Sequence, residues 1–335
     1  KTGIRGITGR HAADNKPEEI PRGWSQEMVK HHFYPNAETA LADLEKCVKK
    51  YNGALDGRVR CWVNIEGKEP CSLALHVGAR ELSEKLGVGT TYHLATSIEE
   101  AEVCESKHSC WPISRINNAG GLGSNLVIAH CAAAKDEEIS LMAAKQVKVA
   151  FCPSSSFKLA KGATSIGKYP QMVEAGVTVG LGTDGVSAAG NLNLMRQMFL
   201  VAGMFKDSHL DPTVFDARRA LRAATIEGAK TLQWDDQIGS LEIGKKADFI
   251  LFDLNHIEWS PYYDPLQTLV FSASTSTISE TWVDGVPCFT KGKVIGVNEN
   301  QLRIKARTLA AQAVIRAGLH EKNVPTESTL YNEGN

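Results

Sequence analysis

Residues 125–152 decide the fold class, and they read NLVIAHCAAAKDEEISLMAAKQVKVAFC. The apolar run at 125–130 has the length and the β-branched content of a buried strand. Residues 135–145 have the composition of a helix, and 147–152 form a second apolar run. A strand, a helix and a second strand in this order are typical of a βαβ unit. We therefore expect an α/β protein with a parallel sheet.

The same alternation continues in both directions from this unit. Four more strands are predicted, at 3–8, 59–65, 88–94 and 177–182, which makes six in all. Helices are predicted at 36–51, 72–86, 97–106, 170–175, 193–204 and 212–231. A (β/α)₈ barrel needs eight strand–helix units, so two units remain to be accounted for.

The composition changes after residue 233. Residues 238–253 are rich in Gly and β-branched side chains, and strand signals recur at 269–271 and 280–286. This pattern predicts a small β-module, which a final helix at 301–317 follows. We therefore divide the chain into a catalytic barrel part, the C-terminal part of a β-sandwich, and a C-terminal helix with its tail, at 1–233, 234–298 and 299–335.

Composition and charge exclude several classes of protein. Hydrophobic residues make up 43% of the 335 residues and charged residues 22%, so disorder, collagen and coiled coil are excluded as the main architecture. Lys and Arg number 37 against 38 Asp and Glu, and this balance gives no reason to expect nucleic acid as a partner. No apolar run approaches the ~20 residues that a membrane span needs. We expect neither a nucleic-acid partner nor a membrane.

The eight cysteines form no Cys-x-x-Cys pair and no zinc-ribbon spacing. Cys131 and Cys152 lie inside apolar, strand-like runs. Buried free thiols are typical of proteins that work in a reducing compartment, so we expect a cytoplasmic protein.

The carboxyl ends of the predicted strands carry the candidate site, because functional side chains of parallel α/β proteins gather at that edge. His93, His130 and Asp184 lie at the ends of three different strands. Taken singly, such a His is more often structural, and an Asp before Gly more often forms a turn. Two imidazoles and a carboxylate together suit a divalent metal such as Zn²⁺ or Fe²⁺. The conjunction favours a metal site.

Several motifs resemble those of the amidohydrolase superfamily. They are TYHLA at 91–95, IAHC at 128–131, CPSS at 152–155, MVEAGV at 172–177, GLGTDG at 180–185, IGSLEIGKKAD at 238–248 and WVDG at 282–285. The similar branch includes S-adenosylhomocysteine deaminase, cytosine deaminase and the triazine hydrolases, among them atrazine chlorohydrolase. The motifs occur in order over nearly the whole chain.

The resemblance implies a TIM (β/α)₈ barrel of the metal-dependent hydrolase type, joined to a small β-sandwich that is built from both chain ends. It implies that His93 and Asp184 bind one divalent metal, which would be Zn²⁺ or else Fe²⁺. It also implies that His130 polarises the substrate or the water, and that Asp184 carries the proton.

The first departure from the family pattern is the lack of a His-x-His pair, which should close the first barrel strand. His31 and His32 are adjacent, so on a strand their side chains would point apart. Residues 3–7 match the third strand of the family. We therefore expect the six strands to be the third to the eighth. The first two units would lie on a missing N-terminal segment or a separate chain that carries the His-x-His ligands.

The second departure is Thr96, which stands where the family has the Glu of a His-x-x-Glu motif. A threonine cannot pass a proton to a leaving nitrogen. Glu99 and Glu100 are the possible replacements. This difference disfavours ordinary deamination, and it affects a leaving group such as chloride less.

The third departure is Glu66, which stands where many deaminases of this branch have a His at the end of the fourth strand. A carboxylate there would pair with a cationic or amino-rich substrate. Alternatively it replaces the lost acid, or it pairs with Lys68. The remaining candidates for contact with the substrate are polar residues that follow the strands, which are Thr96, Ser154, Ser187 and Asn191, although a Ser-rich loop is equally typical of a plain turn.

These observations predict a hydrolase in which a metal-bound hydroxide attacks an sp² carbon of an amidine, a guanidine or an aminated N-heterocycle and releases ammonia or an amine. An s-triazine-type chlorohydrolase or an N-dealkylating amidohydrolase is the alternative among enzymes. A non-catalytic subunit or inactive relative is the alternative from another class. The expected partner is a small-molecule substrate, and the protein is expected to be a homo-oligomer.

Overall fold

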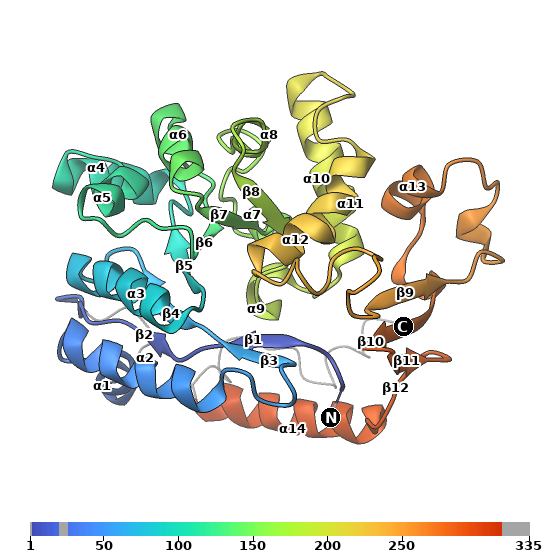
Figure 1. The fold of residues 1–335 in the computed structure, drawn as a ribbon, viewed down its shortest axis with the longest axis horizontal. Helices are drawn as coiled ribbons and strands as arrows, with labels where there is room; N and C mark the ends of the chain where they lie inside the picture. The colour runs from blue at the N-terminus through green and yellow to red at the C-terminus, as the bar shows by residue number, and fades with distance from the viewer. Residues whose placement is uncertain (1, 20–25, 317–335) are drawn as a thin grey trace, which may run out of the picture.

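The computed structural model describes residues 2–19 and 26–316, and a six-stranded parallel sheet lies at its centre (Figure 1). Spatial order follows chain order, so each strand is added on the same side of the one before, as in a (β/α) barrel. The predicted α/β class is confirmed. The strands, in spatial order, are β2 (His11–Ala12), β4 (Val63–Gly67), β5 (Thr90–Leu94), β6 (Leu126–His130), β7 (Lys148–Phe151) and β8 (Thr178–Leu181).

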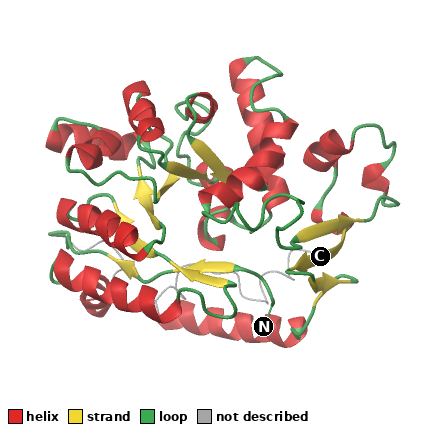
Figure 2. Ribbon diagram, viewed as in Figure 1, coloured by secondary structure: helices red, strands yellow, loops and turns green. Residues whose placement is uncertain are grey.

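Most of the helices lie on the outer side of this curved sheet (Figure 2). Several of them end where the sequence places a capping residue. The Asn36 side chain accepts a hydrogen bond from Thr39 N at 2.9 Å, and Gly87 closes a helix with a left-handed φ of 63°. In chain order the helices are α1 (Gln26–His32), α2 (Ala37–Tyr51), α3 (Leu73–Leu86), α4 (Ile98–His108), α5 (Pro112–Asn118), α6 (Asp136–Ala144), α7 (Pro153–Lys158), α8 (Tyr169–Glu174), α9 (Val186–Ala189), α10 (Leu194–His209), α11 (Ala217–Ala224) and α12 (Ile226–Thr231).

A small antiparallel sheet lies beside the parallel one. Its order is β12 (Lys293–Val294), β11 (Val286–Thr290), β10 (Ile278–Val283) and β9 (Phe249–Phe252), and a short helix, α13 (Pro265–Gln267), lies between β9 and β10 in the chain. The Arg5 guanidinium donates two hydrogen bonds, of 2.7 and 2.9 Å, to the carboxylate of Asp248. This bidentate pair ties the start of the chain to the antiparallel sheet. The long helix α14 (Glu299–Arg316) follows.

Two predicted strands are corrected by the structure. Instead of one strand at 3–8, there are β1 (Gly6–Thr8), which pairs in parallel with β3 (Val59–Cys61), and then β2, which forms the edge of the six-stranded sheet. The apolar run at 269–271 is not a strand but part of a π-helical turn, Thr268–Ser272, which follows α13 directly. The Asp264 side chain caps α13 by accepting from Leu266 N at 2.9 Å. Because a helix already begins there, the apolar run continues it and buries Val270.

Helices are corrected as well. The segment predicted as one helix at 212–231 is two, because Thr225 breaks it with φ −122° and ψ −99°. His31 and His32 lie at the end of α1 and not on a strand. The pattern at 238–253 yields one strand, β9. Residues 317–335, which include the end of the predicted last helix, lie outside the described residues, and the division at 233 and 298 stays a prediction.

All eight cysteines are free, as expected, and Cys131 and Cys152 are buried. Of the described helices, none combines the length and the apolar character that are needed to cross a membrane.

His76 predicts a pH dependence of stability. It lies in α3, its Nδ1 is 2.9 Å from the carbonyl of Ser72, and its buried Nε2 has no hydrogen-bond partner among the described residues. Burial lowers the pKa of His76 from its ordinary value to about 4. Between pH 6.5 and 4, His76 is therefore protonated in the unfolded chain but neutral in the folded chain. The free energy of unfolding thus falls as the pH falls through this range.

We expect His76→Asn, which keeps a donor for Ser72, to lose less stability than the parent between pH 7 and 4.5. The difference should approach about 2–3 kcal/mol, from 1.36 kcal/mol for each unit of pKa. Denaturant unfolding over this pH range measures it. Parallel pH profiles for the two proteins would contradict the assignment.

Candidate functional site

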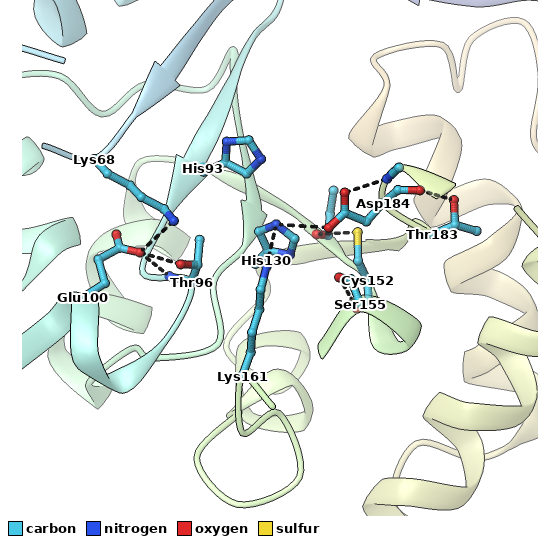
Figure 3. Close-up of polar contacts among 12 residues, drawn as sticks. Lys68, His93, Thr96, Glu100, His130, Cys152, Ser155, Lys161, Thr183 and Asp184 are labelled. Carbon is cyan, nitrogen blue, oxygen red and sulfur yellow. Dashed lines mark hydrogen bonds and ion pairs between the residues drawn. The ribbon is translucent and has the colours of Figure 1, made fainter. Parts of the chain in front are cut away.

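Three predicted residues lie together at the carboxyl edge of the sheet, where Figure 3 shows them. β5 and β6 pair in register, with Leu94 opposite His130, and the ring of His93 stacks on that of His130 at 5.4 Å between centroids. Asp184 follows β8, and its Oδ2 lies 3.7 Å from Nε2 of His130. The side chains of three separate strand ends therefore face one another.

The backbone at this edge is held in the left-handed region. His130 has a φ of 71° and Asp184 a φ of 68°. Such conformations cost on the order of 1 kcal/mol each for residues other than Gly, and they persist only where the surroundings fix them. The Tyr169 hydroxyl donates to the carbonyl of His130 at 2.9 Å, and Gly185 N donates to Oδ1 of Asp184 at 2.6 Å. These contacts hold the backbone of His130 and the side chain of Asp184 in place.

His130 is a neutral imidazole in this arrangement. Burial lowers its pKa to about 3, and the nearby charge of Lys161 adds to the effect. Nζ of Lys161 lies 3.2 Å from Nε2 of His130, and an ammonium can only donate. Nε2 therefore accepts, and the proton of the ring is on Nδ1.

Asp184 is ionised at neutral pH. Burial raises its pKa, but the N–H of Gly185, the Ser155 hydroxyl and the charge of Lys161 lower it, so that the pKa lies below its ordinary value. Cys152 lies beside Asp184, and burial raises the pKa of its thiol to about 12. Since the thiolate is the reactive form, Cys152 is not a nucleophile here.

His93 has the orientation that a metal ligand needs. Its Nδ1 is 3.1 Å from the carbonyl of Glu66, to which it donates. Metal-binding histidines commonly donate their second nitrogen to a carbonyl or carboxylate, which leaves the other nitrogen as a lone-pair donor. Nε2 of His93 thereby keeps a lone pair.

Thr96 and Glu100 form a local network. Glu100 accepts hydrogen bonds from Ala95 N and Thr96 N at 2.8 Å each and from the Thr96 hydroxyl at 2.6 Å, and Lys68 Nζ lies 3.5 Å away. The carboxylate of Glu100 thus caps the end of β5. Its oxygens already accept these hydrogen bonds, which disfavours Glu100 as the acid that protonates the leaving group.

Glu66 contacts histidines and not Lys68. Its Oε2 lies 2.8 Å from Nε2 of His11 and 4.0 Å from Nε2 of His32. The hydrogen bond from His11 lowers the pKa of Glu66 more than burial raises it. Lys68 is paired with Glu100 instead, so the alternative of a Glu66–Lys68 pair is not what the structure has.

The remaining candidates make local contacts. Ser154 is buried, and its hydroxyl accepts from Gln197 Nε2 at 2.7 Å. The carbonyl of Ser187 accepts from Lys158, and the Asn191 side chain accepts from Asn193 N at 3.0 Å. Their contact with a substrate stays a prediction.

The sequence analysis did not identify Lys161, His11 or His32 as site residues. Lys161 lies between α7 and α8, and it reaches a strand end 31 positions earlier in the chain. A lysine in a polar loop carries no sequence signal of such a contact. His11 lies three positions beyond the predicted strand at 3–8. A prediction that included a strand at residues 11–12, where β2 lies, would have placed His11 in the sheet.

His93 and Asp184 offer donor atoms of the type that suits a divalent metal, since one is an imidazole nitrogen and the other an ionised carboxylate. They are two ligands, whereas zinc sites in proteins use three or four. The described residues therefore supply part of a ligand set at this place.

The comparisons with known proteins establish the family of the chain. The model of the amidohydrolase family matches residues 3–288, and the chain belongs to this family. It is 35% identical over 74% of its length to a 5-methylthioadenosine/S-adenosylhomocysteine deaminase of Moorella thermoacetica. It is 31% identical over 84% of its length to a 5'-deoxyadenosine deaminase of Methanosarcina acetivorans. The chain spans 57% and 65% of the lengths of these two relatives.

Solved structures show the same fold. An adenosine deaminase from Xanthomonas campestris with bound zinc has a TM-score of 0.79 at 24% identity, over 93% of this chain and 66% of its own. Atrazine chlorohydrolase from Arthrobacter aurescens, complexed with zinc, has a TM-score of 0.79 at 21% identity, over 92% and 66%. The predicted barrel of the amidohydrolase type is confirmed.

The buried hydrogen bond from Tyr169 to the carbonyl of His130 is expected to contribute to the free energy of unfolding. Tyr169→Phe leaves the carbonyl of His130 without its 2.9 Å donor in a buried place. An unmade buried hydrogen bond costs about 1–3 kcal/mol. We expect chemical denaturation to show that loss, whereas Tyr263→Phe, at an exposed ring, should leave stability unchanged. Equal stabilities of the two variants would contradict the role of Tyr169.

Proposed function

We propose that the protein is a metal-dependent hydrolase. It displaces ammonia or an amine from an sp² carbon of an amidine, a guanidine or an aminated N-heterocycle. The observation that carries the proposal is the convergence of His93, neutral His130 and ionised Asp184 at the carboxyl edge of the sheet. The relatives that are named deaminases support the same class of reaction.

His93 and Asp184 would hold the metal, which we propose to be zinc, with iron as the alternative. The further ligands would come from residues outside this chain, on an N-terminal segment or a separate chain that carries the His-x-His pair. When bound, such a metal supplies an activated water at neutral pH.

Asp184 is the group that takes and holds the proton. It is ionised, and the N–H of Gly185 at 2.6 Å fixes one of its oxygens, so that Oδ2 faces His130 and the reaction space. A carboxylate in this state is ready to accept a proton and to return it later. Its restricted position keeps the acceptor at one place during the reaction.

His130 and Lys161 stabilise the negative charge that develops on the substrate. His130 is neutral, so it orients the substrate and adds no charge of its own. The positive charge is that of Lys161, whose ammonium is 3.2 Å from the ring. Burial lowers the pKa of Lys161, so its ammonium gives up a proton more readily than an exposed lysine. Lys161 is thus our candidate for the donor to a leaving amine.

The second candidate function is that of an s-triazine-type chlorohydrolase or an N-dealkylating amidohydrolase. Thr96 stands in place of the usual acid, and its hydroxyl is bonded to Glu100 at 2.6 Å. A halide leaves without a proton, so this observation favours a chlorinated ring. Release of ammonia or of chloride from a panel of aminated and chlorinated heterocycles separates the two.

The alternative of a non-catalytic subunit predicts no product and no bound metal.

We also propose Thr96, Ser154, Ser187 and Asn191 as residues near the substrate, a cytoplasmic location, and a homo-oligomer. Size measurement in solution tests the last of these.

Asp184→Asn tests the proton-holding role. Amide and carboxylate have the same shape, but an amide cannot accept the proton, so we expect kcat of the full-length protein to fall about 10²–10⁴-fold on its best substrate. Asp211→Asn, in an exposed turn where Asp211 binds Thr213, is the matched control and should keep full activity. Activity of Asp184→Asn within threefold of the parent would refute the role.

Glu66→Gln tests whether this carboxylate contacts a cationic substrate group. Loss of one charge-assisted hydrogen bond costs about 1.5–3 kcal/mol, so KM for a guanidine or amidine should rise roughly 10-fold or more. KM for a neutral chlorinated ring should change little. An equal change for both substrates would show that Glu66 affects the site only indirectly.

A further inference from the structure

Three further side chains of metal-ligating type, none of them His93 or Asp184, lie close together. They are His11 in β2, His32 at the end of α1 and Glu66 in β4, and one ligand atom of each lies within 4.8 Å of the others. Over residues 2–19 and 26–316, no other three His, Cys, Asp or Glu side chains are so close. We call these three residues the edge cluster, because β2 is an edge strand of the six-stranded sheet.

The backbone fixes the members of the edge cluster relative to one another. His11 is paired with Asn64 in the parallel register of β2 and β4. Glu66 is two positions beyond Asn64, where the register with β5 is irregular, and its Oε2 lies 2.8 Å from Nε2 of His11. α1 is tied to the same strand, because Ala13 forms a bridge with Phe33 and accepts a hydrogen bond from Tyr34 N at 2.8 Å. This bond holds His32 close to the strand.

The distances are near those of a metal site. Tetrahedral Zn²⁺ with bonds of about 2.0–2.1 Å separates its ligand atoms by about 3.3 Å. Oε2 of Glu66 is 2.8 Å from Nε2 of His11 and 4.0 Å from Nε2 of His32, so the two separations bracket this value. The third separation, between ligand atoms of His11 and His32, is within 4.8 Å.

The edge cluster is also accessible and electrostatically suited to a cation. The side chains of His11, His32 and Glu66 are 39%, 26% and 28% exposed. A groove of about 590 Å³, lined by both histidines and by Arg10, opens beside them. The charge of Arg10 is balanced by Asp43, which lies 2.9 Å from its Nε. A cation can therefore enter without displacing a buried group.

We propose that His11, His32 and Glu66 form a second divalent-metal site, of the kind that takes Zn²⁺. Two imidazoles and one carboxylate leave an open coordination position for water or another ligand. The site does not depend on the proposed hydrolase activity. It is compatible with the substrate contact proposed for Glu66, because Oε2 faces the histidines and Oε1 is the oxygen that a substrate would use.

The test is metal titration of the metal-free 335-residue chain in an Asp184→Asn background, which weakens binding at the other site without touching the edge cluster. Co²⁺ gives a visible absorption that reports nitrogen and oxygen ligands, and Zn²⁺ competes for the same place. We expect one equivalent to bind, and His11→Ala, His32→Ala and Glu66→Gln each to weaken it at least 10-fold.

His31→Ala is the matched control, because His31 precedes His32 in α1 and lines the same groove, but is not one of the three converging ligands. It should leave Co²⁺ affinity within twofold of the parent. Circular dichroism checks that each variant is folded, and His11→Asn replaces His11→Ala if that variant is not. Equal losses in the His31 and His32 variants, or no loss in the His11 and Glu66 variants, would overturn the proposal.

Discussion

The parallel register of β4, β5 and β6 is the constraint on which the candidate sites depend. In this register Leu94 is opposite His130 and Gly67 is opposite His93, so the strands end at one level. A shift of a strand by one residue would turn its site residue to the other face of the sheet. His93 itself is opposite Ala129, so regular alternation alone would place the side chains of His93 and His130 on opposite faces. The backbone of His130 leaves strand geometry with a φ of 71°, and its ring stacks on that of His93, whose Nδ1 lies 3.1 Å from the carbonyl of Glu66.

The carbonyl and the carboxylate of Glu66 serve different places in the molecule. The carbonyl orients His93, which faces the candidate catalytic centre, while Oε2 of the side chain faces His11 and His32. Glu66 thus contacts His93 through its carbonyl and the two histidines of the edge cluster through its side chain. A change in the backbone at Glu66 would alter both places, whereas a change of its side chain leaves the carbonyl that orients His93 in place.

Local sequence signals predicted much of the fold. The helices predicted at 36–51 and 72–86 correspond to α2 and α3, and the strand ends at His93 and His130 were found because they close clear apolar runs. Short apolar runs were less informative: residues 269–271 continue a helix that Asp264 caps, and length and composition alone do not separate the two cases.

Contacts across long sequence distances could not be predicted. Glu66 was recognised as unusual from its position on a strand, but its pairing with His11 depends on where β2 joins the sheet and on α1, a helix that the sequence analysis did not identify. Lys161 reaches His130 from a loop whose course follows from the packing of α7 and α8. Such contacts depend on tertiary structure, which the pattern of residues along the chain does not encode locally.

The central claim is that His93 and Asp184 hold a metal at the carboxyl edge of the barrel. Anomalous diffraction from crystals of the full-length protein, recorded on both sides of the zinc absorption edge, tests it most directly. The account predicts a peak within bonding distance of Nε2 of His93 and of a carboxylate oxygen of Asp184. Metal-replete crystals with no peak between these two residues, at the zinc edge or at the iron edge, would contradict it.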